Sequence, residues 1–176
     1  MARRARLLLL FLWRVLARWP GVERRLVVLL NGRFAVGIVG IFRDPDGRVL
    51  LLDHGRYRRR YPWGLPGGWH RRGETLIQTI EREMREETGL SVRVESFRHV
   101  ITAFGHPRLE FVVIGTLGEG VPRLNEEVRD YRLISATDDF SMIVPRHKTI
   151  LDYYFGGRRE PFEAAYSLLA PDDPGQ

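Results

Sequence analysis

The spacing of hydrophobic residues changes near residue 26, and the two regions predict different secondary structure. Before that point, apolar side chains recur every three or four residues and would lie on one side of a helix: Leu8, Phe11, Leu12, Val15, Leu16 and Trp19. Arg14 and Arg18 would lie one turn apart on the other side, and Trp19-Pro20-Gly21 would end the helix. The pattern therefore predicts an amphipathic helix within residues 1–20.

This N-terminal arm, residues 1–21, has three interpretations. An amphipathic helix can dock on its own domain or on a second copy of the chain, which would make a homodimer. A basic amphipathic helix can also lie on an anionic membrane surface and give a peripheral membrane contact. A spanning or cleaved segment fits less well, because the apolar run 7–13 is too short for a bilayer and no small-residue cleavage site follows it.

After residue 26 the pattern favours β-strands, because apolar and β-branched residues form short runs between turn signals. A hairpin is expected from residues 34–42 and 49–53, joined by Asp44-Pro45-Asp46-Gly47. The further strands that we expect lie at 26–30, 91–99, 100–104, 110–117 and 131–134. The expected helices lie at 75–88, at 148–155 after Pro145-Arg146-His147, and, as a short addition, at 162–169.

Strands on both sides of one helix, with a second helix near the end, predict an α/β fold with a mixed β-sheet sandwiched between helices. The 176 residues are enough for one domain with its own core, and no internal repeat or long linker divides them. We therefore expect a basic arm at 1–21, one domain at 22–157 and a proline-containing tail at 158–176.

Net charge and cysteine content limit the kinds of ligand and metal site that the chain can have. The net charge of +6 lies in the first 25 residues, which hold one acid and seven arginines: Arg3, Arg4, Arg6, Arg14, Arg18, Arg24 and Arg25. The rest of the chain is neutral, so local arginines or a bound metal would have to attract any polyphosphate ligand. The absence of cysteine excludes disulfides and thiolate metal sites and is typical of the reducing cytoplasm. We expect a cytoplasmic protein, associated with a membrane only if residues 1–20 bind one.

The helix expected at 75–88 carries signals at both ends. Thr75 and Gln78 have the spacing of a capping box, and Gly89 suits the position after the last helical residue. The stripe that we expect to face the core consists of Leu76, Ile77, Ile80 and Met84.

Acidic residues crowd the last two turns of this helix. Ion pairs such as Arg82–Glu86 could make the acids part of a solvated face. However, the helix dipole disfavours acids in C-terminal turns by about 0.3–1 kcal/mol each. Glu83, Glu86 and Glu87 are also spaced so that their like charges meet on one face. A divalent cation would relieve this repulsion, and carboxylates with no His or Cys nearby suit Mg²⁺ or Mn²⁺.

Residues 68–90 resemble the Nudix box, in which nine specified residues stand at fixed spacing. The matching positions are Gly68, Glu74, Arg82, Glu83, Met84, Glu86, Glu87, Gly89 and Leu90. The preceding Trp63-Gly64-Leu65-Pro66-Gly67 resembles the usual approach to the box, and the resemblance extends loosely over residues 34–155. It implies the α/β/α sandwich of that family and hydrolysis of a nucleoside diphosphate linked to another group.

The resemblance also implies roles for the matching residues. The Mg²⁺ or Mn²⁺ ligands would be Glu83, Glu86, Glu87 and the carbonyl of Gly67. Arg82 would pair with Glu74 and hold the loop against the helix. Glu83 or Glu86 would orient or deprotonate the attacking water.

Three residues outside the box are candidates for substrate binding. Arg58 and Trp63 lie in the basic, aromatic stretch 54–63, which could hold a phosphate and stack on a base, or could be a solvated loop. Glu127, beside Glu126, could be the downstream acid that several branches of the family use as a metal ligand or base.

The substrate itself is not assigned by the sequence, because the subgroup markers of the family are not matched. Nucleotides, nucleotide derivatives and capped RNA stay candidates. The alternative function is a domain of the same fold that binds a nucleotide and regulates without cleaving it. The intact set of Glu83, Glu86 and Glu87 argues against that alternative.

Overall fold

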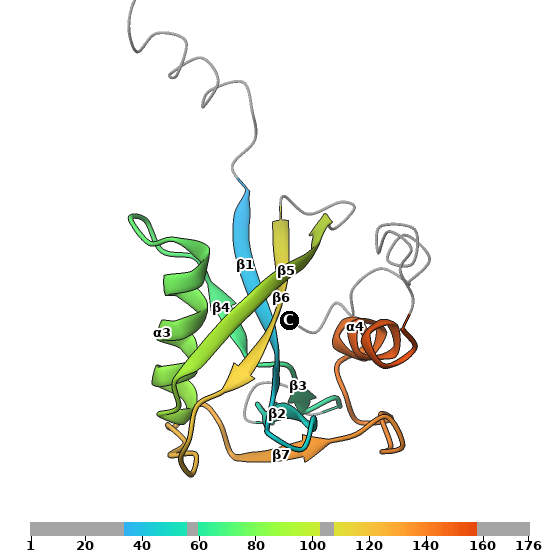
Figure 1. Ribbon diagram of the computed structural model, residues 1–176. Coiled ribbons are helices and arrows are strands. Elements are labelled where there is room, and N and C mark those ends of the chain that lie inside the picture. Colours follow the sequence, from blue (N-terminus) through green and yellow to red (C-terminus); the bar gives the residue numbers. More distant parts are fainter. Residues whose placement is uncertain (1–33, 56–59, 103–107, 158–176) are drawn as a thin grey trace, which may run out of the picture. The chain divides into compact units, whose positions relative to one another are not determined.

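The computed structural model describes residues 34–55, 60–102 and 108–157 (Figure 1). Contacts group the chain from Ala35 onward as one compact unit, distinct from Met1–Phe34. Within the described residues the strands are β1 (Ala35–Arg43), β2 (Val49–Asp53), β3 (Trp63–Gly64), β4 (Gly67–Trp69), β5 (Val92–Thr102), β6 (Arg108–Leu117) and β7 (Asp130–Ile134). The helices are α3 (Leu76–Thr88) and α4 (Pro145–Phe155).

The strand β1 lies at the centre of a mixed sheet. It runs parallel to β6 along its whole length, and β5 lies antiparallel on the outer edge of β6. The other edge of β1 is shared, because β4 pairs with its first half and β2 meets it only at Arg43↔Val49. The strand β2 carries β3 on one edge and β7 on the other, both antiparallel. The segment that precedes α3 is therefore held against the middle of the sheet.

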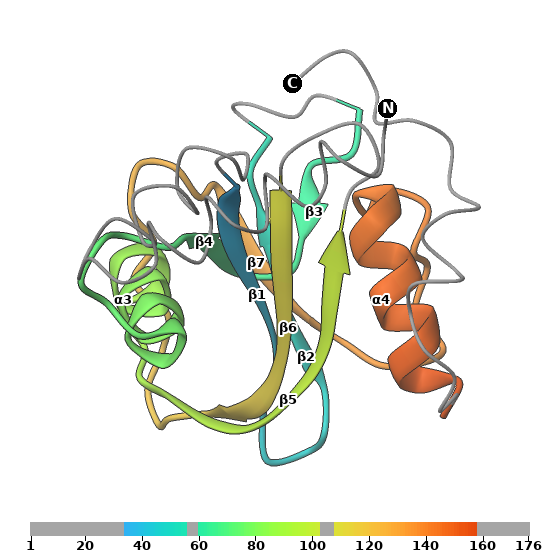
Figure 2. The ribbon, with the colours of Figure 1, turned by 90° about the horizontal axis from the view of Figure 1, so that it is seen from above.

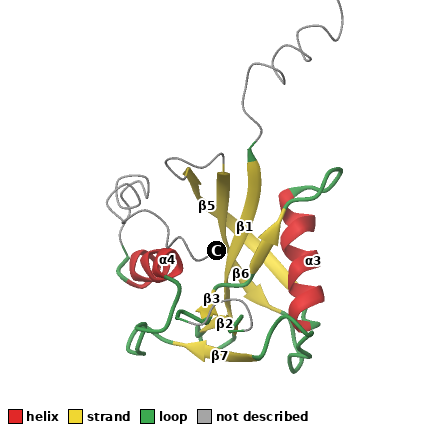
Figure 3. Cartoon of the chain, turned by 180° about the vertical axis from the view of Figure 1, so that it is seen from behind, coloured by secondary structure: helices red, strands yellow, loops and turns green. Residues whose placement is uncertain are grey.

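Side chains of β1 alternate between two hydrophobic cores, one on each face of the sheet. Ile38 and Phe42 join the core under α3, together with Ile80 and Met84 of that helix. The core under α4 is formed from the other face of the sheet by Val39 and Ile41, with Ile150 and Leu151 from the helix. Figure 2 shows the strands between the two helices, and Figure 3 shows the same layers from behind. The α/β sandwich predicted from the sequence is confirmed.

Several predicted elements need correction. The strands expected at 91–99 and 100–104 are one strand, because β5 pairs with β6 continuously and absorbs two bulges. The helix α4 begins at Pro145 rather than at 148, with proline in its first turn, where a missing N–H costs nothing. Ile77, expected in the core, is 41% exposed, since the buried stripe follows Ile80 and Met84.

Some expectations fall outside the described residues. These are the N-terminal amphipathic helix, the strand at 26–30 and the short helix at 162–169. Neither of the two described helices is long and apolar enough to cross a membrane.

Candidate active site

The helix α3 has the capping that its sequence predicts. The Thr75 hydroxyl accepts the backbone N–H of Gln78, and the Gln78 side chain accepts the backbone N–H of Thr75 at 2.8 Å. Gly89 follows the helix with φ 70°, a left-handed conformation that favours glycine, and its N–H donates to the Arg85 carbonyl. These caps fix both ends of the helix that carries the acidic residues.

The strand β4 brings the start of the box against the third turn of α3. A Cβ atom on Gly68 would overlap the carboxyl group of Glu83, with Oε2 only 2.6 Å away. A Cβ on Gly67 would instead collide with backbone atoms of Ile38 and Val39 in β1. Both positions therefore require glycine for close approach, the first to a carboxylate and the second to the sheet.

Arg82 forms hydrogen bonds both with the loop before α3 and with the acidic face of the helix. Its Nε donates to Glu74 Oε1 at 2.7 Å, and its Nη2 donates to Glu74 Oε2 and to the Trp69 carbonyl. Its Nη1 donates to Glu83 Oε1 at 2.7 Å and to Glu86 Oε2 at 3.2 Å. The Arg82–Glu74 contact implied by the resemblance is present, and Arg82 also contacts two of the proposed metal ligands.

Two carboxylates of this network have opposite electrostatic environments. Hydrogen bonding from Arg82, assisted by Thr79 and the Arg71 backbone, lowers the pKa of Glu74 to about 2. Burial raises the pKa of Glu83, and repulsion from Glu87 and Glu86 adds to the effect although Arg82 opposes it. The surroundings of Glu74 thus favour its ionised form, whereas the surroundings of Glu83 disfavour its ionised form.

Glu86 lies at the exposed side of the acidic cluster. Arg71, from the loop before α3, donates to both of its oxygens at 3.3 Å. Because both side chains are well exposed, this ion pair contributes little to stability. Of the three carboxylates, Glu86 can therefore give up an ion pair at the lowest cost in free energy.

Glu87 lies at the buried side and contacts a histidine. His54 follows β2, and its Nε2 lies 3.0 Å from Glu87 Oε1. The other oxygen, Glu87 Oε2, is buried and has no hydrogen-bond partner among the described residues. The sequence-based expectation that no histidine lies near the carboxylates was wrong, because β2 brings residue 54 to residue 87 across the fold.

The cluster fits a hard divalent cation by its chemistry. In the described part of the chain, no group of three acidic, histidine or cysteine side chains is arranged so that it could hold a metal ion. Glu83 and Glu86 contact arginines instead. Nevertheless Glu83 has a raised pKa and Glu87 has an unpartnered buried oxygen, and both features favour an added positive charge. Carboxylate oxygens are the ligands that Mg²⁺ and Mn²⁺ prefer.

The structure describes two of the three candidates outside the box, Trp63 and Glu127. Trp63, in β3, packs against the core under α4, and the Arg132 guanidinium lies over its ring at 4.4 Å. Glu127 is exposed in the loop before β7, where its backbone N–H donates to Asn125 Oδ1. That loop is tied to the end of α3, because the Asn125 N–H donates to the Glu87 carbonyl. Arg58 lies outside the described residues.

Sequence reasoning missed His54 and Arg71, which contact the acidic cluster, and Thr79, whose hydroxyl donates to Glu74. Thr79 could have been found, because a hydroxyl one turn after the cap faces the loop that precedes the helix. Arg71 and His54 carry no local signal, since an arginine in a loop and a histidine after a strand are ordinary surface residues.

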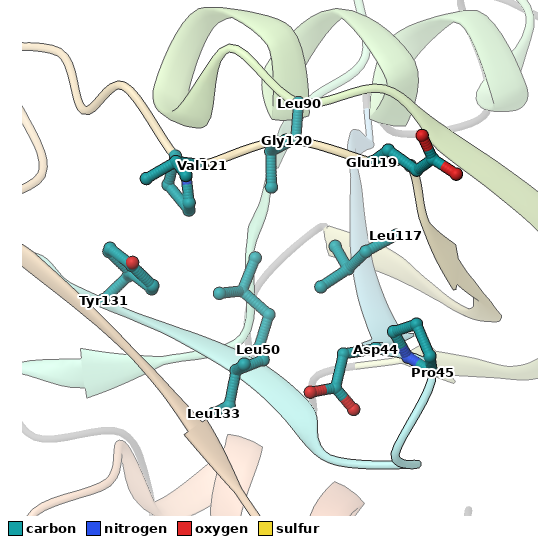
Figure 4. Close-up of a pocket in the computed structure, with 12 residues that line it drawn as sticks. Asp44, Pro45, Leu50, Leu90, Leu117, Glu119, Gly120, Val121, Tyr131 and Leu133 are labelled. Atoms are coloured by element: carbon teal, nitrogen blue, oxygen red, sulfur yellow. The ribbon is translucent and has the colours of Figure 1, made fainter.

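The cavity in Figure 4 lies elsewhere. It has a volume of about 360 Å³ and is lined mainly by apolar side chains of β2, β7 and loop 118–122, with Leu90 above them. None of the three box carboxylates is among its described lining residues. The acidic face of α3, and not this cavity, is therefore the candidate site.

Comparisons with known proteins show which family the chain belongs to. The NUDIX domain family matches residues 33–154. The human 8-oxo-dGDP phosphatase NUDT18 is 27% identical over 108 residues, which cover 61% of this chain and 33% of that protein. The ADP-ribose pyrophosphatase of Methanocaldococcus jannaschii is 26% identical over 124 residues, which cover 68% of this chain and 72% of that one.

A solved structure of a NUDIX hydrolase from Nitrosomonas europaea has the same fold. It is 21% identical, with a TM-score of 0.65 over 74% of this chain and 76% of that chain. This chain spans about a third of the length of the human relative and about three quarters of the archaeal one. Because the family match extends over well more than half of the chain and includes the intact box on α3, the protein belongs to the Nudix family.

Proposed function

We propose that the protein is a divalent-metal-dependent pyrophosphohydrolase that cleaves the diphosphate linkage of a nucleotide or nucleotide derivative. The observation that carries this proposal is the acidic face of α3, where Arg82 contacts Glu83 and Glu86, and His54 contacts the neighbouring Glu87. Nudix proteins generally depend on divalent metals, and the chemistry of this donor set agrees with that dependence.

The metal would be held by Glu83, Glu86 and Glu87, with the carbonyl of Gly67 as a further ligand. When bound, a divalent cation supplies neutralisation of the diphosphate charge and acidification of the attacking water. Arg71 contacts Glu86, and Arg82 contacts both Glu83 and Glu86. Arg82 also donates to both Glu74 oxygens and to the Trp69 carbonyl, and these three bonds hold the loop before α3 independently of Glu83 and Glu86.

Glu83 and Glu86 are both candidates for the residue that orients or deprotonates the attacking water. Glu74 cannot take this role, because Arg82 lowers its pKa to about 2. Glu86 is exposed and paired with arginines, which suits a ligand that exchanges readily.

The substrate class rests on what the named relatives have in common. One is named for a nucleoside diphosphate, 8-oxo-dGDP, and the other for a nucleoside diphosphate attached to a sugar, ADP-ribose. A nucleoside diphosphate, free or joined to a second group, is therefore the proposed substrate. Residues 26–176 together carry no net charge and add little long-range attraction for it, so recognition depends on local arginines and on the metal.

A hydrolysis screen tests this proposal. The panel contains nucleoside diphosphates and triphosphates, ADP-ribose, nucleotide sugars, CDP-alcohols and capped RNA, each with Mg²⁺, with Mn²⁺ or with a chelator. The expected result is metal-dependent breakage of a phosphoanhydride bond, with a nucleoside monophosphate among the products. Binding of a nucleotide with no cleavage under any condition would support the regulatory alternative instead.

A further inference from the structure

His54 is held firmly between the end of β2 and the helix α3. Its backbone N–H donates to the Pro62 carbonyl at 2.8 Å. On its N-terminal side, the Asp53 carbonyl accepts the Arg129 N–H at 2.8 Å, and the Asp53 side chain accepts the Gly55 N–H at 2.6 Å. The imidazole therefore starts from a fixed backbone position, with its side chain only 15% exposed.

The imidazole ring contacts only one of the two oxygens of the Glu87 carboxylate, so the two oxygens have different surroundings. Ionised Glu87 only accepts hydrogen bonds, so with Glu87 in that form the His54 Nε2 carries the proton and donates to Oε1. The His54 Nδ1 is then a buried acceptor with no hydrogen-bond partner among the described residues. The second oxygen, Oε2, is buried and without a hydrogen-bond partner among the described residues. Leaving a buried carboxylate oxygen unpartnered is unfavourable unless a ligand satisfies it.

We propose that His54 is a positioning residue of the metal site, which fixes the Glu87 carboxylate so that Oε2 is presented to a hard divalent cation. This inference rests on the proposed function, because it takes Glu87 as a metal ligand. Without the donor on Oε1, the carboxylate can rotate about its terminal torsion, which has broad preferences of its own. A partner that orients a ligand in this way typically changes metal affinity 10- to 100-fold.

A purely structural role for His54 makes a different prediction. In that case the histidine only satisfies a buried carboxylate, and its loss lowers the stability of the metal-free protein without changing metal affinity. The two roles are therefore separated by measuring metal binding and thermal stability on the same variants. Neither measurement depends on knowing the substrate.

Variants of the full chain provide matched changes at this position. His54→Phe keeps the ring and removes the donor, whereas His54→Gln keeps an N–H donor at a similar distance from the backbone. His54→Asn is polar but too short to reach Glu87, and it replaces His54→Phe if that variant does not fold. Mn²⁺ affinity is measured by titration with electron paramagnetic resonance, and melting temperature is measured without metal.

The expected result is Mn²⁺ affinity about 10- to 100-fold weaker in His54→Phe and His54→Asn, with His54→Gln restoring most of the loss. Wild-type affinity in His54→Phe with only a lower melting temperature would overturn the inference. So would a His54→Gln variant that binds as weakly as His54→Phe. Failure of the proposed function looks different, because Glu87→Gln would then bind Mn²⁺ like the wild type.

Discussion

Substitutions at three glycines test whether the position of the Glu83 carboxylate, rather than the integrity of the fold, governs activity. In Gly68→Ala the new methyl group would overlap the Glu83 carboxyl, which is the flexible end of a side chain and can swing away. In Gly67→Ala the methyl would meet backbone atoms of β1, which cannot move. In Gly37→Ala it would lie 3.6 Å from Trp69 Cζ3, an ordinary contact distance.

The free-energy cost of Gly68→Ala has two contributions. Swinging the Glu83 carboxylate to another rotamer costs about 0.5–1.5 kcal/mol. It also breaks the hydrogen bond from Arg82, of a class worth about 1.5–3 kcal/mol. Part of that loss is offset, because burial and the neighbouring carboxylates already disfavour ionised Glu83. We expect Gly68→Ala to destabilise the protein by about 1–3 kcal/mol, comparable to other overpacking substitutions.

The assay compares melting temperature and metal-dependent turnover across the series. Each kcal/mol corresponds to about 2–4 °C in a protein of this size. Gly68→Ala should remain folded but lose about 10²-fold in turnover, because misplacing a catalytic group by about 1 Å has that effect. Gly67→Ala should lose the most stability, and Gly37→Ala should match the wild type in both measurements. Wild-type turnover in Gly68→Ala would refute the claim that Glu83 must lie directly against β4.

Three further predictions concern the ends and charges of α3. Thr75→Ala removes the side-chain cap and should lower the free energy of unfolding by about 1 kcal/mol. The melting temperature should then fall by about 2–4 °C while turnover is unchanged. An unchanged melting temperature would argue against the capping box. Because the pKa of Glu74 falls to about 2 on folding from an ordinary 4.5, its charge stabilises the fold above about pH 4.5 and that contribution is lost as pH falls toward 2. The melting-temperature gap between wild type and Glu74→Gln should therefore close over this range, and a constant gap would contradict the assignment. The charge of Glu83 has the opposite effect on stability, because its raised pKa makes the ionised form unfavourable above pH 4.5. Metal-free Glu83→Gln at pH 7 should therefore melt no lower than the wild type. A lower melting temperature would contradict the direction of the pKa shift.

Local patterns were enough to predict the layers of the fold and the limits of α3. The turn at 44–47 and the strand at 49–53 depend on turn chemistry and alternation that lie within a few residues. The caps at Thr75 and Gly89 are equally local. The short strands β3 and β4 were not predicted as strands, because two or three residues contain no period and their pairing is decided by β1 and β2.

The part of the candidate site on α3 was predicted from helical spacing, and the resemblance to the Nudix box added the Arg82–Glu74 contact with the loop before the helix. Helical spacing placed Glu83, Glu86 and Glu87 on one side of α3, but it could not say which of them is buried. That distinction comes from long-range contacts, since Glu87 meets His54 from β2 and Glu83 meets Gly68 from β4. Sequence periodicity contains no information about such pairs, whose partners are separated by tens of residues.

In the proposed function, the acidic face of α3 holds a metal for phosphoanhydride hydrolysis. The most direct measurement is the metal-dependent turnover of the best substrate from the screen by Glu87→Gln, a change of one buried carboxylate to an amide of the same shape. We predict turnover at least about 10²-fold lower, with weaker Mn²⁺ binding and a fold that still melts cooperatively. Turnover within a few-fold of the wild type at the same metal concentration would contradict it.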